Sequence, residues 1–141
     1  MLSPSDESTK ELILDEELYH ETGTLQKENT ADGILPYSDN DVKYEIWLRA
    51  YNGYTYIWAS STAYNVLMDR ISTTCAAYYE SGKLIDEDVR SLSGSGNIQN
   101  CSAIVEVPKN PFNFQAYSAM SSHSFSKKGY EPYQKILTWR R

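Results

Sequence analysis

The sequence predicts an α+β domain, in which one main helix packs on an antiparallel sheet of about five strands. Three observations support this prediction. Residues 43–61 alternate in polarity around an Asn-Gly pair, residues 62–80 carry apolar side chains at helical spacing, and residues 101–139 are rich in β-branched and aromatic residues between turn signals. The expected order is a hairpin, a helix and three strands, with the helix covering the apolar face of the sheet.

The hairpin is the strongest local signal. Asn52-Gly53 favours a two-residue type I′ turn, which would place Tyr51 opposite Tyr54 and Trp47 opposite Trp58. Because side chains alternate along a strand, the hairpin then has two distinct faces. The aliphatic face, expected in the core, consists of Ile46, Leu48, Ala50, Thr55, Ile57 and Ala59. The aromatic face consists of Trp47, Arg49, Tyr51, Tyr54, Tyr56 and Trp58.

The helix is predicted over residues 62–80, with Gly82 at the position of a helix-ending glycine. Its apolar residues recur at steps of three and four: Tyr64, Leu67, Met68, Ile71 and Cys75. Together with the hairpin it predicts one contiguous core, made of Ile46, Leu48, Ile57, Leu67, Met68 and Ile71. A shorter helical turn is expected over residues 86–92.

Three strands are expected after the helix, over residues 101–107, 112–126 and 133–139. A turn at Lys127-Lys128-Gly129 separates the last two strands. This order of elements, over residues 43–139, resembles the roadblock, longin and profilin-like group and the small proteasome-assembly chaperones. The resemblance implies a non-enzymatic role, in which the domain pairs with a similar subunit through a strand or a helix.

Charge divides the chain into an arm and a body. Residues 1–40 carry ten acidic and two basic groups, whereas residues 41–141 carry nine acidic and eleven basic groups. We interpret residues 1–40 as an acidic, partly disordered arm with a short helix around Leu14 and Leu18, and residues 41–141 as the folded domain. The arm is expected to be dispensable for folding. An alternative is that it folds over the basic C-terminal end and competes there with a partner.

Residue types that support catalysis or metal binding are sparse. His20 lies in the acidic arm, and His123 shares its strand face with Ser121, which alone is not a catalytic triad. Cys75 and Cys101 are expected to be reduced thiols, because the N-terminus lacks the pattern of an export signal. The sequence therefore predicts a non-catalytic intracellular protein, cytoplasmic or nuclear, without a metal or a cofactor.

The aromatic face indicates a binding role. Interface cores are enriched in Tyr, Trp and Arg, so we predict an adaptor or subunit of a complex that pairs with another protein as a homo- or heterodimer. One alternative is that the arm covers these rings through Leu12, Ile13, Leu14 and Leu18. Another is nucleic-acid binding, because aromatic rings beside a cation also stack on bases. The basic contact for that alternative would come from Lys127, Lys128, Lys135, Arg140 and Arg141. The net charge of −6 disfavours it, since phosphate neutralisation drives such binding.

Overall fold

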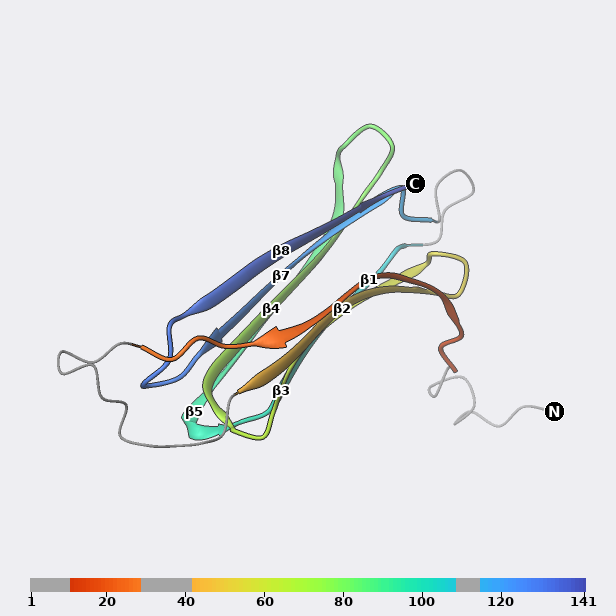
Figure 1. Cartoon of the computed structure of the whole chain (residues 1–141). Helices are drawn as coiled ribbons and strands as arrows, with labels where there is room; N and C mark the ends of the chain where they lie inside the picture. The colour runs from red at the N-terminus through yellow and green to blue at the C-terminus, as the bar shows by residue number, and fades with distance from the viewer. Residues whose placement is uncertain (1–10, 29–41, 109–114) are drawn as a thin grey trace.

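The chain folds into a two-layer β-sandwich of eight strands (Figure 1). The computed structural model describes residues 11–28, 42–108 and 115–141, and none of the residues in these ranges is helical. The strands are β1 (Leu14–Thr24), β2 (Lys43–Tyr51), β3 (Tyr56–Tyr64), β4 (Met68–Tyr78), β5 (Leu84–Ile98), β6 (Asn100–Glu106), β7 (Ser118–Ser126) and β8 (Tyr133–Arg140).

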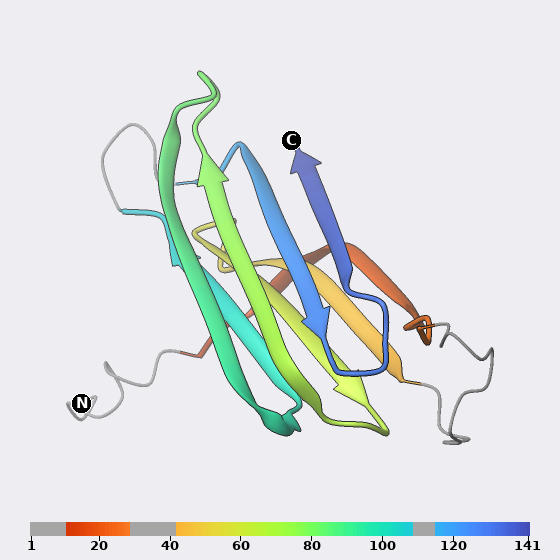
Figure 2. The ribbon, with the colours of Figure 1, turned by 90° about the vertical axis from the view of Figure 1, so that its left-hand side faces the viewer.

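Both sheets are antiparallel and four-stranded, in the orders β1-β2-β3-β6 and β5-β4-β7-β8. Figure 2 looks onto the second sheet, with the first sheet behind it. The chain crosses between the sheets after β3, after β5 and after β6. Without β1, the order and connections of the remaining seven strands follow the Greek-key connectivity of immunoglobulin-like sandwiches. One strand differs: β5 lies beside β4 in the second sheet, whereas the corresponding strand of the seven-stranded immunoglobulin fold lies at the edge of the first sheet.

The core lies between the two sheets, because residues at alternate positions of the central strands point inward. Ile46 and Leu48 of β2 and Ile57 of β3 are fully buried in one cluster with Met68 and Ile71 of β4. These five members of the predicted core are confirmed. The prediction that Leu67 is the sixth core residue is wrong, because Leu67 lies in the β3–β4 connection and is exposed.

The α+β prediction is wrong, because the segment expected as the main helix forms the end of β3, a short connection and β4. An irregular register between Met68 and Arg70 puts Met68 and Ile71 on the same face at a spacing of three. From Ile71 to Cys75 every second residue is buried, so Ile71 and Cys75 share a face at a spacing of four. An irregular start of the strand followed by alternation thus imitates helical spacing.

The other helical expectations are also corrected. The residues around Leu14 and Leu18 form β1, whose register on β2 shifts between Leu14 and Glu16 and again between Glu17 and Tyr19. The turn expected over residues 86–92 lies inside β5. Without the helix, and with eight strands instead of five, the likeness to the roadblock, longin and profilin-like group does not hold. The boundary proposed near residue 41 lies outside the described residues and stays a prediction.

The hairpin loop is two residues longer than expected. Tyr51 pairs with Tyr56, so residues 52–55 form the loop and Arg49 lies opposite Trp58. The predicted positive φ at Asn52 and Gly53 is present, at 54° and 70°, but Tyr54 also has a positive φ of 63°. Contacts outside the hairpin stabilise the wider loop, since Asn52 bonds the backbone of Ile13 in both directions. The predicted register is displaced by two residues. Since side chains alternate between faces with a period of two, this displacement leaves the strand residues on their predicted faces.

Candidate functional site

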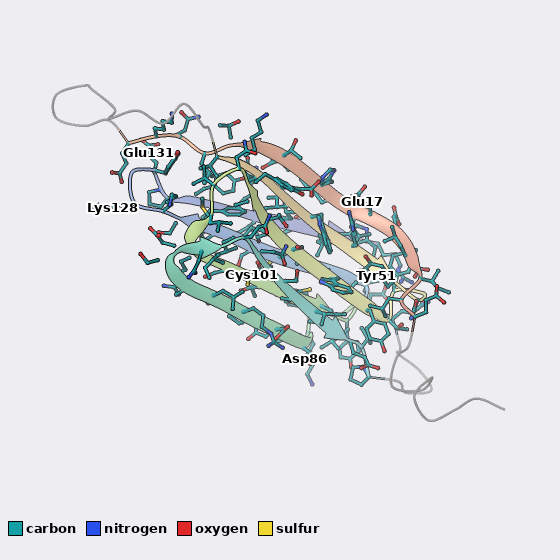
Figure 3. The ribbon with its side chains drawn as sticks, turned by 90° about the horizontal axis from the view of Figure 1, so that it is seen from below. Glu17, Tyr51, Asp86, Cys101, Lys128 and Glu131 are labelled. Carbon is teal, nitrogen blue, oxygen red and sulfur yellow. The ribbon has the colours of Figure 1, made fainter. Side chains whose placement is uncertain are left out.

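The outer face of the sheet β1-β2-β3-β6 carries the aromatic side chains. Figure 3 looks onto this sheet, with Glu17 and Tyr51 near one end. Cross-strand partners share a face, so the register defines three adjacent rows of side chains. The rows are Leu14, Tyr51, Tyr56 and Glu106; then Glu17, Arg49, Trp58 and Ile104; then His20, Trp47, Ser60 and Ser102. We call Trp47, Arg49, Tyr51, Tyr56 and Trp58 the aromatic face.

The rings of the aromatic face form one contact cluster. Trp58 lies 6.2 Å from Trp47 and 5.7 Å from Tyr51, measured between ring centroids. The Arg49 guanidinium carbon lies 4.0 Å from the centre of the Trp47 ring, and Arg49 Nη2 is 3.2 Å from Glu17 Oε1. Stacking on Trp47 and pairing with Glu17 therefore hold Arg49 in a fixed position.

Two hydrogen-bond donors at the centre of this cluster have no acceptor. Arg49 Nε and Trp58 Nε1 are buried and unpaired among the residues that the structure describes. A buried donor without a partner costs free energy, typically about 1–3 kcal/mol. The two residues are cross-strand partners on the outer face, where water or a bound partner can supply the acceptors.

Tyr54 does not belong to the aromatic face. Its ring stacks on Trp139 of β8 at a centroid distance of 5.3 Å and an interplanar angle of 7°, with the Arg141 guanidinium 4.7 Å away. Its hydroxyl donates to Glu16, and this bond raises the pKa of the Tyr54 hydroxyl. Tyr54 therefore fastens the hairpin loop to β8 and to β1.

Two carboxylates near the edge of the first sheet, Glu45 of β2 and Glu21 of β1, are held by hydrogen bonds. His20 Nε2 lies 2.7 Å from Glu45 Oε2, and the Tyr64 hydroxyl donates to Glu45 Oε1 at 2.7 Å. Hydrogen bonds from Tyr64 and His20 lower the pKa of Glu45. Glu21, on the inner side of β1, accepts from the Tyr133 hydroxyl at 2.7 Å, which lowers its pKa. Both carboxylates are therefore ionised at neutral pH. Glu45, on the outer face beside Trp47 and Arg49, makes the rim of the aromatic face negative, whereas Glu21 faces the inner side of the sheet.

The basic residues named for nucleic-acid binding do not form one patch. Lys127 and Lys128 are in the β7–β8 turn, where the Lys128 amide donates to Asp69, and Figure 3 shows Lys128 at the far end from Tyr51. Lys135 lies 3.8 Å from Glu21. At the other end of β8, Arg140 lies over Tyr117, and the guanidinium of Arg141 donates to the Ala116 carbonyl. The five cations are thus divided among three places.

The Ser–His contacts at His123, which could suggest catalysis, lie buried in the core. His123 bonds Ser61 through Nδ1 at 2.7 Å and Ser121 through Nε2 at 2.8 Å. Ser61 also bonds Thr73, whose hydroxyl donates to the Cys101 carbonyl, so the network joins both sheets. All of these side chains are buried. Without access to solvent the network can position the sheets but cannot reach a substrate.

The two cysteines are free and buried. Burial raises the pKa of the Cys75 thiol to about 12, so it is protonated and unreactive at neutral pH. Among the described residues, no group of three or more His, Cys, Asp or Glu side chains is placed to hold a metal ion. The same residues include no helix of the length and apolarity needed to cross a membrane.

A shallow pocket adjoins the aromatic face where β5 runs alongside β6. It has a volume of about 330 Å³ and includes Trp58, Asp88, Arg90, Asn100 and Ser102 in its lining. Sequence reasoning missed this pocket, since a short helical turn was expected over residues 86–92 and these residues were not placed near β6. The only available signal was the alternation of Asp88, Arg90 and Leu92, which is too short to distinguish a strand from a helical turn.

Comparison with known proteins does not assign the chain to a family, because no protein-family model, curated protein or solved structure matches it. The fold and the geometry of the surface are therefore the basis for a functional proposal.

Proposed function

We propose that this protein is a non-catalytic interaction domain, an adaptor or subunit of an intracellular complex, that binds another protein through the aromatic face. The observation that carries the proposal is the contiguous cluster of Trp47, Arg49, Tyr51 and Trp58 on the outside of a sheet. Trp, Tyr and Arg are the residues that most often dominate the binding energy of protein interfaces. The partner is a second copy of this chain or a different subunit.

Charge supports a protein partner over a nucleic acid. The cation within the aromatic face, Arg49, is paired with Glu17, and further carboxylates lie at the rim. The remaining basic side chains are dispersed, so a phosphate backbone would find few adjacent cations. A protein surface with apolar and basic side chains would instead complement both the rings and the acidic rim.

Site-specific cross-linking tests this proposal. Benzoylphenylalanine at Tyr56, inside the aromatic face, should give a discrete cross-linked species with the native partner or with a second copy. The same probe at Thr74, on the outer face of the opposite sheet, is the matched control and should give none. Trp47→Ala should abolish the product while Met120→Ala, an apolar truncation on the opposite outer face, should keep it.

Two results would count against the proposal. Equal cross-linking from Tyr56 and Thr74 would show that the aromatic face has no special role. A fall in stability of several kcal/mol for Trp47→Ala, of the size found for fully buried aromatics, would show that the ring is a part of the core. Solution mass of the purified chain then distinguishes a homodimer from a heterodimer.

A further inference from the structure

The pocket beside the aromatic face has one wall made of a fixed ion pair. Arg90 Nε donates to both carboxylate oxygens of Asp88, at 3.0 and 3.1 Å, and the backbone N–H of Ile104 donates to Asp88 Oδ2 at 3.0 Å. Asp88 thus bridges β5 to the edge of β6. Because only Nε of Arg90 is bonded within the described residues, its terminal Nη groups remain available on a side chain that is 62% exposed.

The part of the lining that β6 contributes contains a network of neutral polar groups. Asn100 Nδ2 donates to Ser60 at 3.0 Å and to Thr62 at 2.6 Å, and the Ser102 hydroxyl lies 3.0 Å from Ser60. These bonds fix the orientations of the amide and of the hydroxyls before any ligand arrives. Trp58, in the neighbouring strand β3, contributes an apolar ring to the same pocket.

This combination of groups matches a particular ligand chemistry. A carboxylate beside free guanidinium N–H groups presents an acceptor and donors side by side, which suits two adjacent hydroxyl groups that each donate and accept. An indole ring suits a flat apolar surface such as the C–H face of a sugar ring. The charges of Asp88 and Arg90 cancel, so the pocket does not favour a phosphate or a polyanion. Its volume of about 330 Å³ is at the small end of ligand sites.

We propose that the pocket between β5 and β6 binds a neutral pyranose sugar, as a monosaccharide unit or the end of a glycan. The Asp88–Arg90 pair bonds adjacent hydroxyl groups, Asn100 and Ser102 contact other polar groups of the sugar, and Trp58 packs against its C–H face. This site goes beyond the protein-binding role of the aromatic face and shares only Trp58 with it.

Nuclear magnetic resonance of the full ¹⁵N-labelled chain tests the sugar site. The probes are the methyl glycosides of glucose, mannose, galactose and N-acetylglucosamine. A ligand of this size is expected to bind with a dissociation constant of about 1 mM, so each probe is added to roughly 50 mM. At least one should give saturable shifts at the Trp58 indole N–H and at the amides of Asp88, Arg90 and Ser102.

A matched pair of arginine variants makes the test specific. Arg90→Ala should weaken binding by about tenfold or more, because charged hydrogen bonds to the sugar are lost. Arg70→Ala removes an exposed arginine on the neighbouring strand β4, which bonds Ser91 in a similar way, and should leave the affinity unchanged. Both side chains are exposed, so neither change should unfold the protein.

Three outcomes would overturn the sugar site: no saturable shift with any of the four probes, equal weakening by both arginine variants, or binding only to an anionic polysaccharide such as heparin with loss at high salt. The protein-binding proposal fails independently. Trp47 does not line the pocket, so Trp47→Ala should retain sugar binding even though it removes the partner.

Discussion

Acidification should destabilise this protein through a single buried histidine. His123 is fully buried between the sheets, and burial lowers its pKa to about 4, although the nearby Glu21 carboxylate opposes the shift. In the neutral form one ring nitrogen donates and the other accepts, and the hydroxyls of Ser61 and Ser121 can satisfy both. Protonation would place a charge inside the core, where it has lost its hydration.

The magnitude follows from proton linkage. The unfolded chain has the ordinary histidine pKa of 6.5, so between about pH 6.5 and pH 4 it binds more protons than the folded chain. The stabilisation is therefore fully present above about pH 6.5 and is lost as the pH falls toward about 4. The total loss is about 3 kcal/mol, of which about 2 kcal/mol falls between roughly pH 7 and pH 5.

Urea unfolding at a series of pH values measures this loss, with tryptophan fluorescence as the probe. His123→Gln, whose amide can still bond both serines, should remove the pH dependence between roughly pH 7 and pH 5 while lowering stability at pH 7. Carboxylates with lowered pKa, such as Glu21 and Glu45, titrate below this interval and do not obscure it. Parallel pH curves for the two proteins would refute the reasoning, as would a folded-state His123 pKa near 6.5 by nuclear magnetic resonance.

Further predictions concern packing, backbone strain and thiol reactivity. Leu48→Ala should lower the free energy of unfolding by about 2–5 kcal/mol, since Leu48 is fully buried; a loss below about 1 kcal/mol would contradict its place in the core. Gly23→Ala should cost about 1–3 kcal/mol in urea unfolding, because a Cβ there would lie 2.5 Å from the Tyr44 hydroxyl oxygen and 2.7 Å from the nearest atom of its ring. Gly53→Val should cost at least about 1–2 kcal/mol, because φ is 70°; wild-type stability would show that the loop can rearrange. Cys75 should react with a thiol reagent only after unfolding, and reaction in the native protein at the rate of a free thiol would disprove its burial.

The fold class could not be predicted because local irregularities changed the apparent period of the sequence. In β4 the shift between Met68 and Arg70 produced a spacing of three, which adjoined a regular strand and imitated a helix. In β1 the spacing of four between Leu14 and Leu18 does not reflect a shared face, because Leu14 pairs with Tyr51 on the outer face whereas Leu18 packs against the core. A bulge is stabilised by pairing with a neighbouring strand, and that partner lies far away in the sequence, so the local pattern did not reveal it.

The faces of the hairpin could be predicted because they depend only on alternation. The predicted loop was two residues shorter than the observed one. The strand residues of the aliphatic face are nevertheless all fully buried as expected: Ile46, Leu48, Ala50, Ile57 and Ala59. The aromatic face kept five of its six predicted members for the same reason. Tyr54 was lost from it because the longer loop left the strand, and stacking on Trp139 of β8 could not be inferred from the hairpin alone.

Trp58 connects the two proposed binding sites and makes their relation measurable. Its ring contacts Trp47 and Tyr51 within the aromatic face and also lines the sugar pocket. A partner that covers or rotates this ring must change the affinity for the sugar, and the sugar must change the affinity for the partner by the same factor. If the partner buries the Trp58 face, the two ligands compete, and saturating methyl glycoside should weaken the partner complex of the wild type. Because Arg90→Ala lowers only the affinity for the sugar, it should abolish that competition without weakening the partner complex itself. Competition that persists in Arg90→Ala would show that the sugar acts at another place, most directly on the aromatic face.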